Sequence, residues 1–307
     1  MAIDHLDRRP RSPDPMSPRP QPVWSHALGR LRLDRPIVMG ILNVTPDSFS
    51  DGGRFFSVDE ALARAESLVA EGADVIDVGG ESTRPQGATP VDAAEECRRV
   101  LPVIGEVRRR FPNVVISVDT VKADVAERAL GEGAAIVNDV SAFRLDDQMA
   151  DVCAHASAGV VLMHSRGGVS DMATFAHASY GADVAGEVLA ELLARAEVAE
   201  LAGVRREAIV LDPGIGFSKR SEHSIAVLQE LPRMVDAGYP VMVGVSRKRF
   251  IGEISGVRDP AERVHGTTGA NVMALAFGAR IFRVHDVAAA RQALDVAWAI
   301  LQPELNG

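Results

Sequence analysis

Polar and charged side chains recur at the ends of short apolar runs along this chain. They include carboxylates, an amide, imidazoles and cations, which together could bind and transform a polar small molecule. Taken singly, each could instead cap the helix that follows it or serve a loop. Their repetition at the same place in successive units favours one shared site. The residues are Asn43, Glu81, Asp119, Asn138, Asp139, His164, Asp212, Ser246, Lys248, Arg283, His285 and Asp286.

The positions of the lysines also indicate a shared site at the ends of the apolar runs. The chain is rich in arginine and has only three lysines, Lys122, Lys219 and Lys248, each of which follows one of these runs. Stray lysines in an arginine-biased sequence are the plain alternative. Clustering at one rim instead predicts contact with an anion or substrate, above all by Lys248 beside Arg247. In a chain of net charge −9, cations gathered there suit a phosphate-bearing ligand.

The elements that must position these residues alternate regularly. Short β-branched apolar runs are followed by longer stretches with helical periodicity, and a glycine closes most of the helical stretches, where a left-handed residue is favoured. We predict strands at 37–43, 75–78, 114–119, 135–139, 159–164, 209–212, 241–246 and 280–285, and helices at 59–71, 92–110, 123–132, 148–157, 182–201, 222–237, 262–277 and 287–301.

Nearly continuous apolar strands are typical of a parallel sheet that is buried on both faces, with helices outside. Eight β/α units in about 265 residues favour a closed (β/α)₈ TIM barrel, a fold of the α/β class, over an open doubly wound sheet, although the pattern alone does not establish closure. In such a barrel the carboxyl ends of the strands carry the chemistry. The polar residues above lie at those ends.

The N-terminal segment differs from the rest of the chain. Residues 1–22 combine repeated proline and arginine with mixed charge and lack apolar periodicity, so they cannot offset the entropy of ordering. We predict a flexible tail over 1–22 and a single catalytic domain over 23–307, in which 24–33 forms a short strand or a cap.

Composition limits the partners. A pI near 5.4 without a basic patch argues against nucleic acid. No apolar run approaches the roughly 20 residues that cross a bilayer, and the N-terminus lacks the apolar stretch of a secretory signal. Cys97 and Cys153 have neither disulfide nor metal-site spacing. We expect a cytoplasmic protein that acts on small molecules, without a nucleic-acid or membrane partner.

Two longer motifs resemble a known family. Residues 39–53, MGILNVTPDSFSDGG, and 77–85, DVGGESTRP, closely resemble the two signatures of the dihydropteroate synthase family. The resemblance continues through the later strand ends, at 117–120, 137–140, 162–164, 211–214, 244–248 and 283–287, and covers nearly everything after residue 35. That family is built on a (β/α)₈ barrel, in agreement with the strand count.

The resemblance implies a transferase of folate biosynthesis. It would join 6-hydroxymethyl-7,8-dihydropterin diphosphate to p-aminobenzoate, with diphosphate leaving first, and would form 7,8-dihydropteroate. Mg²⁺ is the implied cofactor, and a homodimer the implied assembly, for which 270–277 and 287–301 are apolar enough. Such enzymes are sulfonamide targets.

The same resemblance implies a role for each site residue. Asp119, Lys248 and Asp51 are the implied catalytic residues. The pterin would contact Asp119, Asn138, Met163, Asp212 and Lys248; the diphosphate Asn43, Arg283 and His285; the metal Asn43; and p-aminobenzoate Phe49, Thr83, Arg84, Pro85, Phe217 and Lys248.

Three points stay open at this stage. Gln86 is an extra residue in the second loop, which leaves the geometry of the p-aminobenzoate subsite and the affinity for sulfonamides undecided. The first loop, 43–53, ends in two glycines and is either a lid or a plain surface loop. A pterin-dependent methyltransferase and a catalytically silent paralogue are the alternatives; the intact motifs at 43–53 and 81–85 argue against the first.

Overall fold

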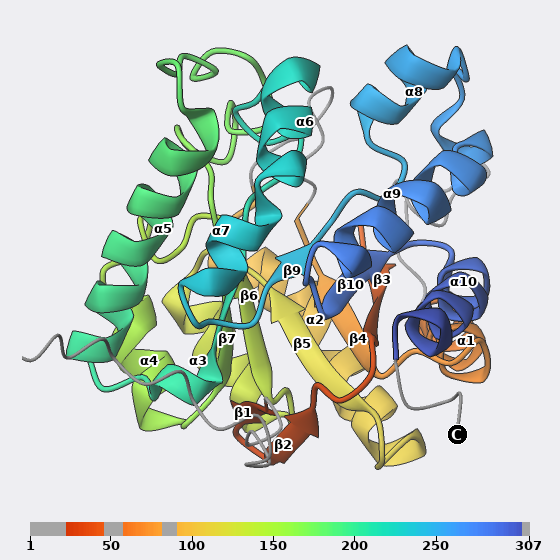
Figure 1. The fold of residues 1–307 in the computed structure, drawn as a ribbon. Coiled ribbons are helices and arrows are strands. Elements are labelled where there is room, and N and C mark those ends of the chain that lie inside the picture. The colour runs from red at the N-terminus through yellow and green to blue at the C-terminus, as the bar shows by residue number, and fades with distance from the viewer. Residues whose placement is uncertain (1–22, 46–57, 82–90, 303–307) are drawn as a thin grey trace, which may run out of the picture.

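The structure is a computed structural model, and it describes residues 23–45, 58–81 and 91–302. Within these ranges, strands and helices alternate around a central sheet of eight parallel strands (Figure 1). The strands of this sheet are β3 (Ile37–Asn43), β4 (Val75–Gly79), β5 (Val115–Asp119), β6 (Ile136–Asp139), β7 (Gly159–Met163), β8 (Ile209–Asp212), β9 (Met242–Val243) and β10 (Ile281–Val284).

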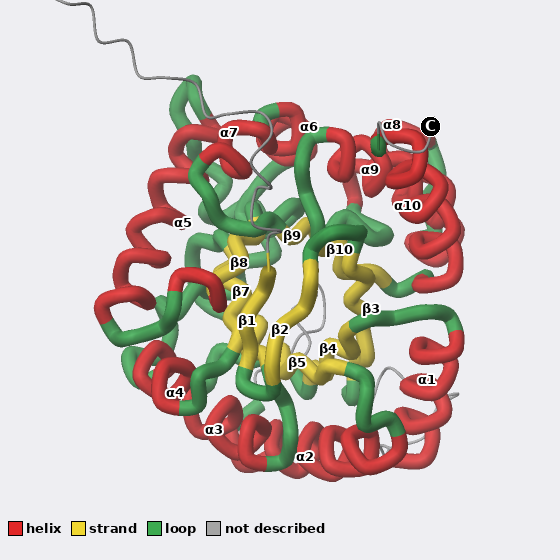
Figure 2. The backbone as a smooth tube through the Cα atoms, turned by 60° about the horizontal axis from the view of Figure 1, so that its bottom comes forward, coloured by secondary structure: helices red, strands yellow, loops and turns green. Residues whose placement is uncertain are grey.

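The sheet closes into a barrel. Strands β3 to β8 pair in chain order, and β10 pairs with both β3 and β9. The last gap, between β8 and β9, is bridged where Leu211 meets Val241 and where the Leu211 amide donates to the Pro240 carbonyl at 3.0 Å. Figure 2 shows the strands as a ring with the helices outside it. The predicted TIM barrel is confirmed, and the closure that the pattern could not establish is present.

The helices lie close to their predicted positions, with two differences. The predicted helix at 222–237 is two helices, because Pro232 lacks the amide proton that a continuing helix needs. The predicted strand at 241–246 is only two residues long, and a short helix, which the pattern did not predict, follows it. The helices are α1 (Val58–Ala70), α2 (Ala93–Arg110), α3 (Ala123–Gly131), α4 (Met149–His155), α5 (Val184–Leu201), α6 (Ser221–Gln229), α7 (Leu231–Asp236), α8 (Arg249–Ser255), α9 (Val264–Ala276) and α10 (Val287–Leu301), with 3-10 turns at Arg206–Ala208 and Pro260–Glu262.

The glycines predicted to end helices have the required backbone. Each has a positive φ, between 82° and 111°, a region that other residues rarely adopt. Each therefore turns the chain from the end of a helix into the next strand. They are Gly72, Gly133, Gly203, Gly238 and Gly278.

A hairpin covers the amino-terminal end of the barrel. Strands β1 (Val23–His26) and β2 (Gly29–Arg32) pair antiparallel below the ring (Figures 1 and 2). The Trp24 side chain is fully buried, packs in one cluster with inward-facing strand residues such as Met39 and Ile136, and donates from Nε1 to the Ala208 carbonyl at 2.9 Å. The segment 24–33 is thus both strand and cap, and it closes the end of the barrel opposite the polar rim. None of the helices described is long and apolar enough to span a membrane.

Candidate active site

A cavity of about 820 Å³ opens at the carboxyl ends of the strands. Its size is that of a pocket for one or two small molecules. Each strand of the barrel, or the residues just after it, contributes to its wall. The contributing residues are Ile41 and Asn43 from β3, Glu81 after β4, Asp119 from β5, Asn138 from β6, Met163 from β7, Asp212 from β8, Met242 from β9 and Arg283 from β10.

All the described residues to which the family resemblance gives a role line this cavity, although they come from distant parts of the sequence. They are Asn43, Asp119, Asn138, Met163, Asp212, Phe217, Lys248, Arg283 and His285. The remaining residues with an implied role lie outside the described residues: Phe49, Asp51, Thr83, Arg84 and Pro85, together with the extra Gln86. Of the other polar residues predicted at the strand ends, Glu81 and Ser246 line the cavity, whereas Asp139, His164 and Asp286 do not.

Arg283 joins two carboxylates at the floor of the cavity. Its Nε donates to Asp77 Oδ2 and its Nη2 to Asp119 Oδ2, both at 2.6 Å. The pair of acids raises the pKa of the guanidinium, against the effect of burial, so it stays charged. Two of its five N–H donors are used by these bonds, which leaves donors for an anion in the cavity.

Asp77 was not among the predicted site residues, yet it organises this floor. It is fully buried, and the same Oδ2 that binds Arg283 accepts a bond from Asn138 Nδ2 at 3.0 Å. The signal was present in the sequence: Asp77 is a carboxylate inside an apolar strand that is buried on both faces, and such a charge requires a partner.

Asn138 is consequently oriented by Asp77. With Nδ2 bound, its Oδ1 is a buried acceptor that no described residue pairs. An unpaired buried acceptor is costly, and an N–H group of a ligand would satisfy it. The amide orientation follows from this hydrogen-bond pattern.

The surroundings of Asp119 disfavour the ionised form of its carboxyl group. Burial raises its pKa to about 7, the nearby Asp77, Glu96 and Asp139 add to the rise, and Arg283 opposes it. When Asp119 is ionised, its negative charge is stabilised mainly by Arg283. A positive charge that develops in the cavity would be stabilised by this carboxylate, because the surroundings screen little.

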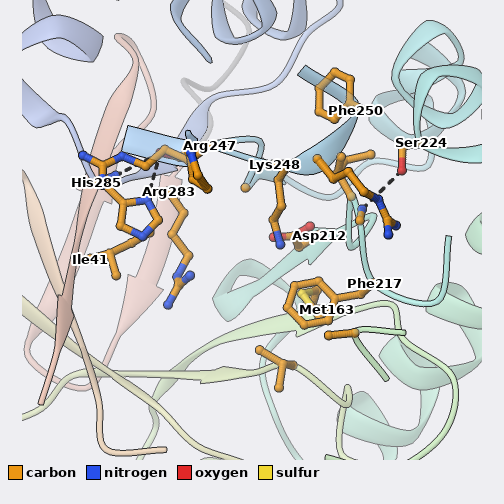
Figure 3. Close-up of a pocket in the computed structure, with 18 of the residues that line it drawn as sticks. Ile41, Met163, Asp212, Phe217, Ser224, Arg247, Lys248, Phe250, Arg283 and His285 are labelled. Carbon is orange, nitrogen blue, oxygen red and sulfur yellow. Dashed lines mark hydrogen bonds between the residues drawn. The ribbon is translucent and has the colours of Figure 1, made fainter. Parts of the chain in front are cut away.

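Asp212 and Lys248 both line the cavity, as does Phe217 (Figure 3). Asp212 Oδ1 accepts the Gly214 amide at 2.7 Å, and burial raises the pKa of its carboxyl to about 6. Burial also lowers the pKa of Lys248 to about 8, with Arg283 adding to the effect and Asp212 opposing it. The Lys248 Nζ lies 4.0 Å from the centre of the Phe217 ring, a cation–π contact. Among the three lysines, Lys248 is the one whose position fits the predicted contact with a ligand.

Lys122 and Lys219 have protein partners instead. Lys122 Nζ binds Glu81 at 2.8 Å and Glu96 at 2.6 Å. Lys219 is fully buried, and its Nζ lies 2.8 Å from His164 Nδ1. All three lysines therefore lie at the carboxyl end of the barrel, but their roles differ.

His285 is held as a neutral donor. Its Nδ1 lies 3.0 Å from Ser246 Oγ, and the same oxygen accepts the His285 amide at 3.2 Å. The Ser246 hydroxyl has no other acceptor among the described residues, so we assign its proton to the bond with Nδ1 and the proton of the neutral ring to Nε2. Burial, with Arg247 and Arg283 adding to its effect, lowers the pKa of His285 to about 3. The imidazole can donate a hydrogen bond to an anion beside Arg283 without carrying a charge.

Arg247 lines the cavity beside Lys248 and is paired with Asp286. Its Nη2 and Nε bind the two oxygens of Asp286, at 2.6 and 3.0 Å. Its backbone has a φ of 61°, in the turn between the shortened β9 and α8. The ion pair with Asp286 supports this turn, and Lys248 remains the predicted contact with an anion or substrate.

Comparisons with known proteins agree on one family. The model of the pterin-binding enzymes matches residues 39–285. A dihydropteroate synthase of Synechocystis sp. is 46% identical over 266 residues, which are 87% of this chain and 90% of the relative. The dihydropteroate synthase of Xanthomonas albilineans, solved with 4-aminobenzoic acid, superposes with a TM-score of 0.85 at 44% identity, covering 92% of this chain and all of that one. The same enzyme in complex with 7,8-dihydropteroate gives a TM-score of 0.82 at 41% identity, with the same coverage.

Proposed function

The chain belongs to the family of pterin-binding enzymes, and we propose that it catalyses the dihydropteroate synthase reaction. It joins 6-hydroxymethyl-7,8-dihydropterin diphosphate to p-aminobenzoate, and 7,8-dihydropteroate and diphosphate are the products. One observation carries the proposal: a single cavity combines acceptors suited to a pterin, on Asn138 and Asp212, with anion donors on Arg283 and His285.

The pterin occupies the deep part of the cavity. Its amino and ring N–H groups donate to the carboxylate of Asp212 and to Oδ1 of Asn138, the acceptor that lacks a partner. Met163 supplies an apolar wall for the flat ring, and Lys248 lies at its edge. Binding a pterin thus satisfies the polar groups that are costly in the free protein.

The diphosphate lies against Arg283 and His285. The guanidinium supplies charge and the neutral imidazole supplies a donor, both already fixed by Asp77 and Ser246. Because both donors are held before the substrate arrives, little reorganisation is needed when charge develops on the leaving group.

Mg²⁺ fits this side of the site. Among the described residues no three His, Cys, Asp or Glu side chains gather to hold a metal, but the Asn43 amide offers an oxygen ligand on the cavity wall. Mg²⁺ prefers oxygen ligands and is commonly bound through few protein groups together with substrate phosphates. When bound, the ion neutralises charge on the departing diphosphate.

In the reaction the carbon–oxygen bond to diphosphate breaks first, and the electron pair leaves with the diphosphate. Positive charge then develops on the methylene group of the pterin, where Asp119 stabilises it. The aniline nitrogen, a neutral nucleophile near pH 7, forms the new carbon–nitrogen bond and then loses a proton. Asp51, outside the described residues, remains a predicted assistant.

The acceptor p-aminobenzoate binds at the outer part of the cavity. Phe217 and Lys248 are the described residues of this subsite, and Phe49, Thr83, Arg84 and Pro85 remain predicted from the family motif. Exclusion of water matters here, because water would compete with the amine for the pterin cation.

We further propose a cytoplasmic homodimer. Cys97 and Cys153 are both free and buried, as in proteins of reducing compartments. Helices α9 and α10, which pack on each other, expose the apolar side chains Met273, Val296 and Ile300, and a second copy of the chain would cover them.

Titration of p-aminobenzoate into the protein tests the substrate order. We expect calorimetry to detect binding only when diphosphate and Mg²⁺ are present, and Arg283→Gln to abolish this binding because the diphosphate loses its charged partner. Arg280→Gln is the control, because Arg280 comes just before β10 but binds the Leu275 and Ala279 carbonyls outside the cavity. If p-aminobenzoate binds the wild-type chain equally well without diphosphate, a catalytically silent paralogue would be favoured.

A further inference from the structure

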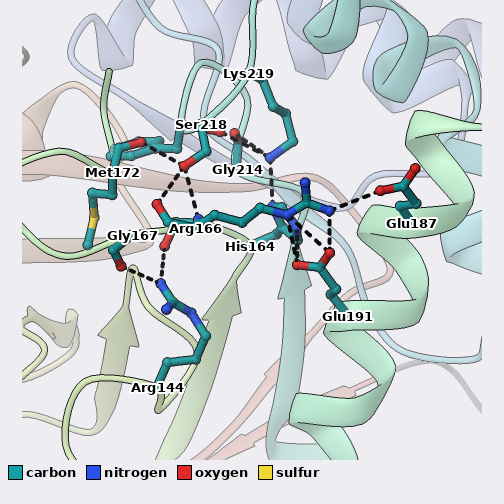
Figure 4. A network of polar contacts seen from close by, with 12 residues as sticks. Arg144, His164, Arg166, Gly167, Met172, Glu187, Glu191, Gly214, Ser218 and Lys219 are labelled. Carbon is teal, nitrogen blue, oxygen red and sulfur yellow. Dashed lines mark hydrogen bonds and ion pairs between the residues drawn. The ribbon is translucent and has the colours of Figure 1, made fainter. Parts of the chain in front are cut away.

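Lys219 is a buried cation for which the proposed chemistry has no task. It lies between β8 and α6, and its side chain is fully buried (Figure 4). No carboxylate forms a hydrogen bond or ion pair with it in the described part of the chain. A buried ammonium is costly unless its donors are satisfied, so its partners indicate what it does.

Three acceptors surround the ammonium, one for each proton. His164 Nδ1 lies at 2.8 Å, the Phe217 carbonyl at 3.1 Å and the Gly214 carbonyl at 3.2 Å. The three donors of a protonated lysine match these three acceptors when Nδ1 accepts, and burial lowers the pKa of Lys219 to about 7. Burial and Lys219 itself lower the pKa of His164 to about 4, which keeps the imidazole neutral.

The imidazole connects the ammonium to a charged network behind it (Figure 4). His164 Nε2 lies 3.0 Å from Glu191 on α5, and Glu191 is also bound by Arg166. The Arg166 guanidinium stacks on Tyr180 at 4.1 Å from the ring centre. The network therefore connects the end of β7 to α5 and fixes the orientation of the His164 ring, whose Nδ1 accepts the hydrogen bond from Lys219.

The segment 213–218 wraps around the ammonium. Gly214, Gly216 and Ser218 all have positive φ, between 47° and 79°. Ser218 is attached to the neighbouring loop, because its Oγ accepts the Arg166 amide at 2.9 Å and lies within hydrogen-bond distance of the Arg166 and Met172 carbonyls. Within the segment, the ammonium of Lys219 supplies the donors that the buried carbonyls of Gly214 and Phe217 need.

The same segment presents Phe217 to the cavity. The carbonyl of Phe217 binds Lys219, while the ring on the other side lies 4.0 Å from Lys248 Nζ. The position of the ring is thus fixed from behind by one lysine, and the ring in turn lies against the other. Phe217 belongs to the p-aminobenzoate subsite of the proposed function.

We propose that Lys219 is a positioning residue for the acceptor subsite: its buried ammonium gathers the carbonyls of Gly214 and Phe217 and the imidazole of His164, and so holds the Phe217 ring where p-aminobenzoate binds. The inference rests on the proposed function. It adds a residue whose ammonium is bound by three protein acceptors and which acts through Phe217.

Steady-state kinetics of Lys219→Met in the full chain test the proposal. Methionine keeps the length and apolar stem of the side chain and removes all three donors. We expect KM for p-aminobenzoate to rise about tenfold, while kcat and KM for the pterin diphosphate stay within about threefold of wild type. Equal rises in both KM values, or no rise, would overturn the proposal.

A double-mutant cycle identifies the route of the effect. If Lys219 acts through Phe217, Lys219→Met should add little to KM for p-aminobenzoate in a Phe217→Ala background. Additive effects would show that Lys219 acts elsewhere. Arg195→Met is the matched control: Arg195 also binds two loop carbonyls at this end of the barrel, those of Ala142 and Phe143 at 2.7 Å, and neither residue lines the cavity. Its KM values should remain those of wild type.

A second variant covers the case in which Lys219→Met does not fold. His164→Leu removes one of the three acceptors and should raise KM for p-aminobenzoate about threefold, with the same selectivity and the same absence of effect in the Phe217→Ala background. The wild-type chain is assayed first. No product from wild type would overturn the proposed function and this inference with it, whereas product together with unselective variants would overturn the inference alone.

Discussion

Asp119 and Asp77 share one guanidinium, but only Asp119 lines the cavity. This division predicts that Asp119→Asn folds normally and loses most turnover, by about 100-fold or more, because shape is kept and charge is lost. The measurement is kcat, with circular dichroism as the check on folding.

Asp139→Asn is the control for Asp119→Asn. Asp139 is a buried carboxylate at the same end of the barrel, but it binds Ser141 and the Phe143 amide and does not line the cavity. It should lose stability and keep turnover. A near-native rate in Asp119→Asn would rule out the electrostatic role of Asp119.

Asp212 predicts a dependence of stability on pH. Its folded-state pKa of about 6 lies above the unfolded value of 3.8, so its contribution to stability is greatest below the unfolded pKa and is lost as the pH rises through 6. Asp212→Asn should therefore stabilise the ligand-free protein on the order of 2 to 3 kcal/mol at pH 8, and about half as much at pH 5. Chemical unfolding at the two pH values measures this; a gain independent of pH would contradict the pKa shift.

The motifs predicted which residues meet, because a family signature preserves positions at strand ends. The same signature did not predict the hydrogen-bond and ion-pair partners of these residues. Arg247 pairs with Asp286, Lys122 with two glutamates, and Arg283 with Asp77, since each depends on side-chain directions that linear spacing does not encode. The motif positions outside the described residues, Phe49 and Thr83 among them, stay predictions.

Among the elements, the turn after β8 depends most on a single glycine. Gly214 has a φ of 65°, and a Cβ there would collide with the His164 carbonyl. Gly214→Ala should lower the free energy of unfolding by about 3 kcal/mol or more and impair activity, because backbone strain adds to the clash. Thermal or chemical denaturation measures the loss.

Gly131→Ala is the matched control. Gly131 is the last residue of α3, and a Cβ there would meet nothing within 4 Å. This variant should be neutral or slightly stabilising. Similar losses in both variants would show that the turn after β8 has no special requirement for glycine.

The strands and helices were predictable to the extent that they are long. Periodicity located β3, β8 and α10 at their observed bounds, because several apolar positions had to agree. The two-residue β9 and the seven-residue α8 are too short to show a period, and their shape follows from the turn at Arg247. Closure of the barrel depends on the contact between β8 and β9, which no local pattern contains.

At the scale of the whole molecule, Trp24 closes the amino-terminal end of the barrel, and the cavity opens at the carboxyl end. Apolar side chains are exposed on the C-terminal helices α9 and α10. Replacing Val296 and Ile300, which are 58% and 78% exposed on α10, with aspartate should convert a dimer into monomers, because charge would then be buried at the contact. Light scattering coupled to size exclusion gives the mass. Leu201→Asp is the control, since Leu201 is 82% exposed but lies at the end of α5; a wild-type chain that runs as a monomer would contradict the proposed dimer.

The N-terminal tail should be dispensable. The polar rim lies at the opposite end of the barrel from the β1–β2 hairpin, with which the described chain begins. A protein that lacks residues 1–20 should keep its kcat and both KM values. A large loss of rate on truncation would make the tail part of the site.

The proposed reaction is tested most directly by supplying the purified protein with the pterin diphosphate and Mg²⁺, with and without p-aminobenzoate, and following released diphosphate and 7,8-dihydropteroate by mass spectrometry. We expect diphosphate and dihydropteroate in equal amounts when p-aminobenzoate is present. Pterin diphosphate that stays bound and unconverted in the presence of p-aminobenzoate would contradict the proposed reaction.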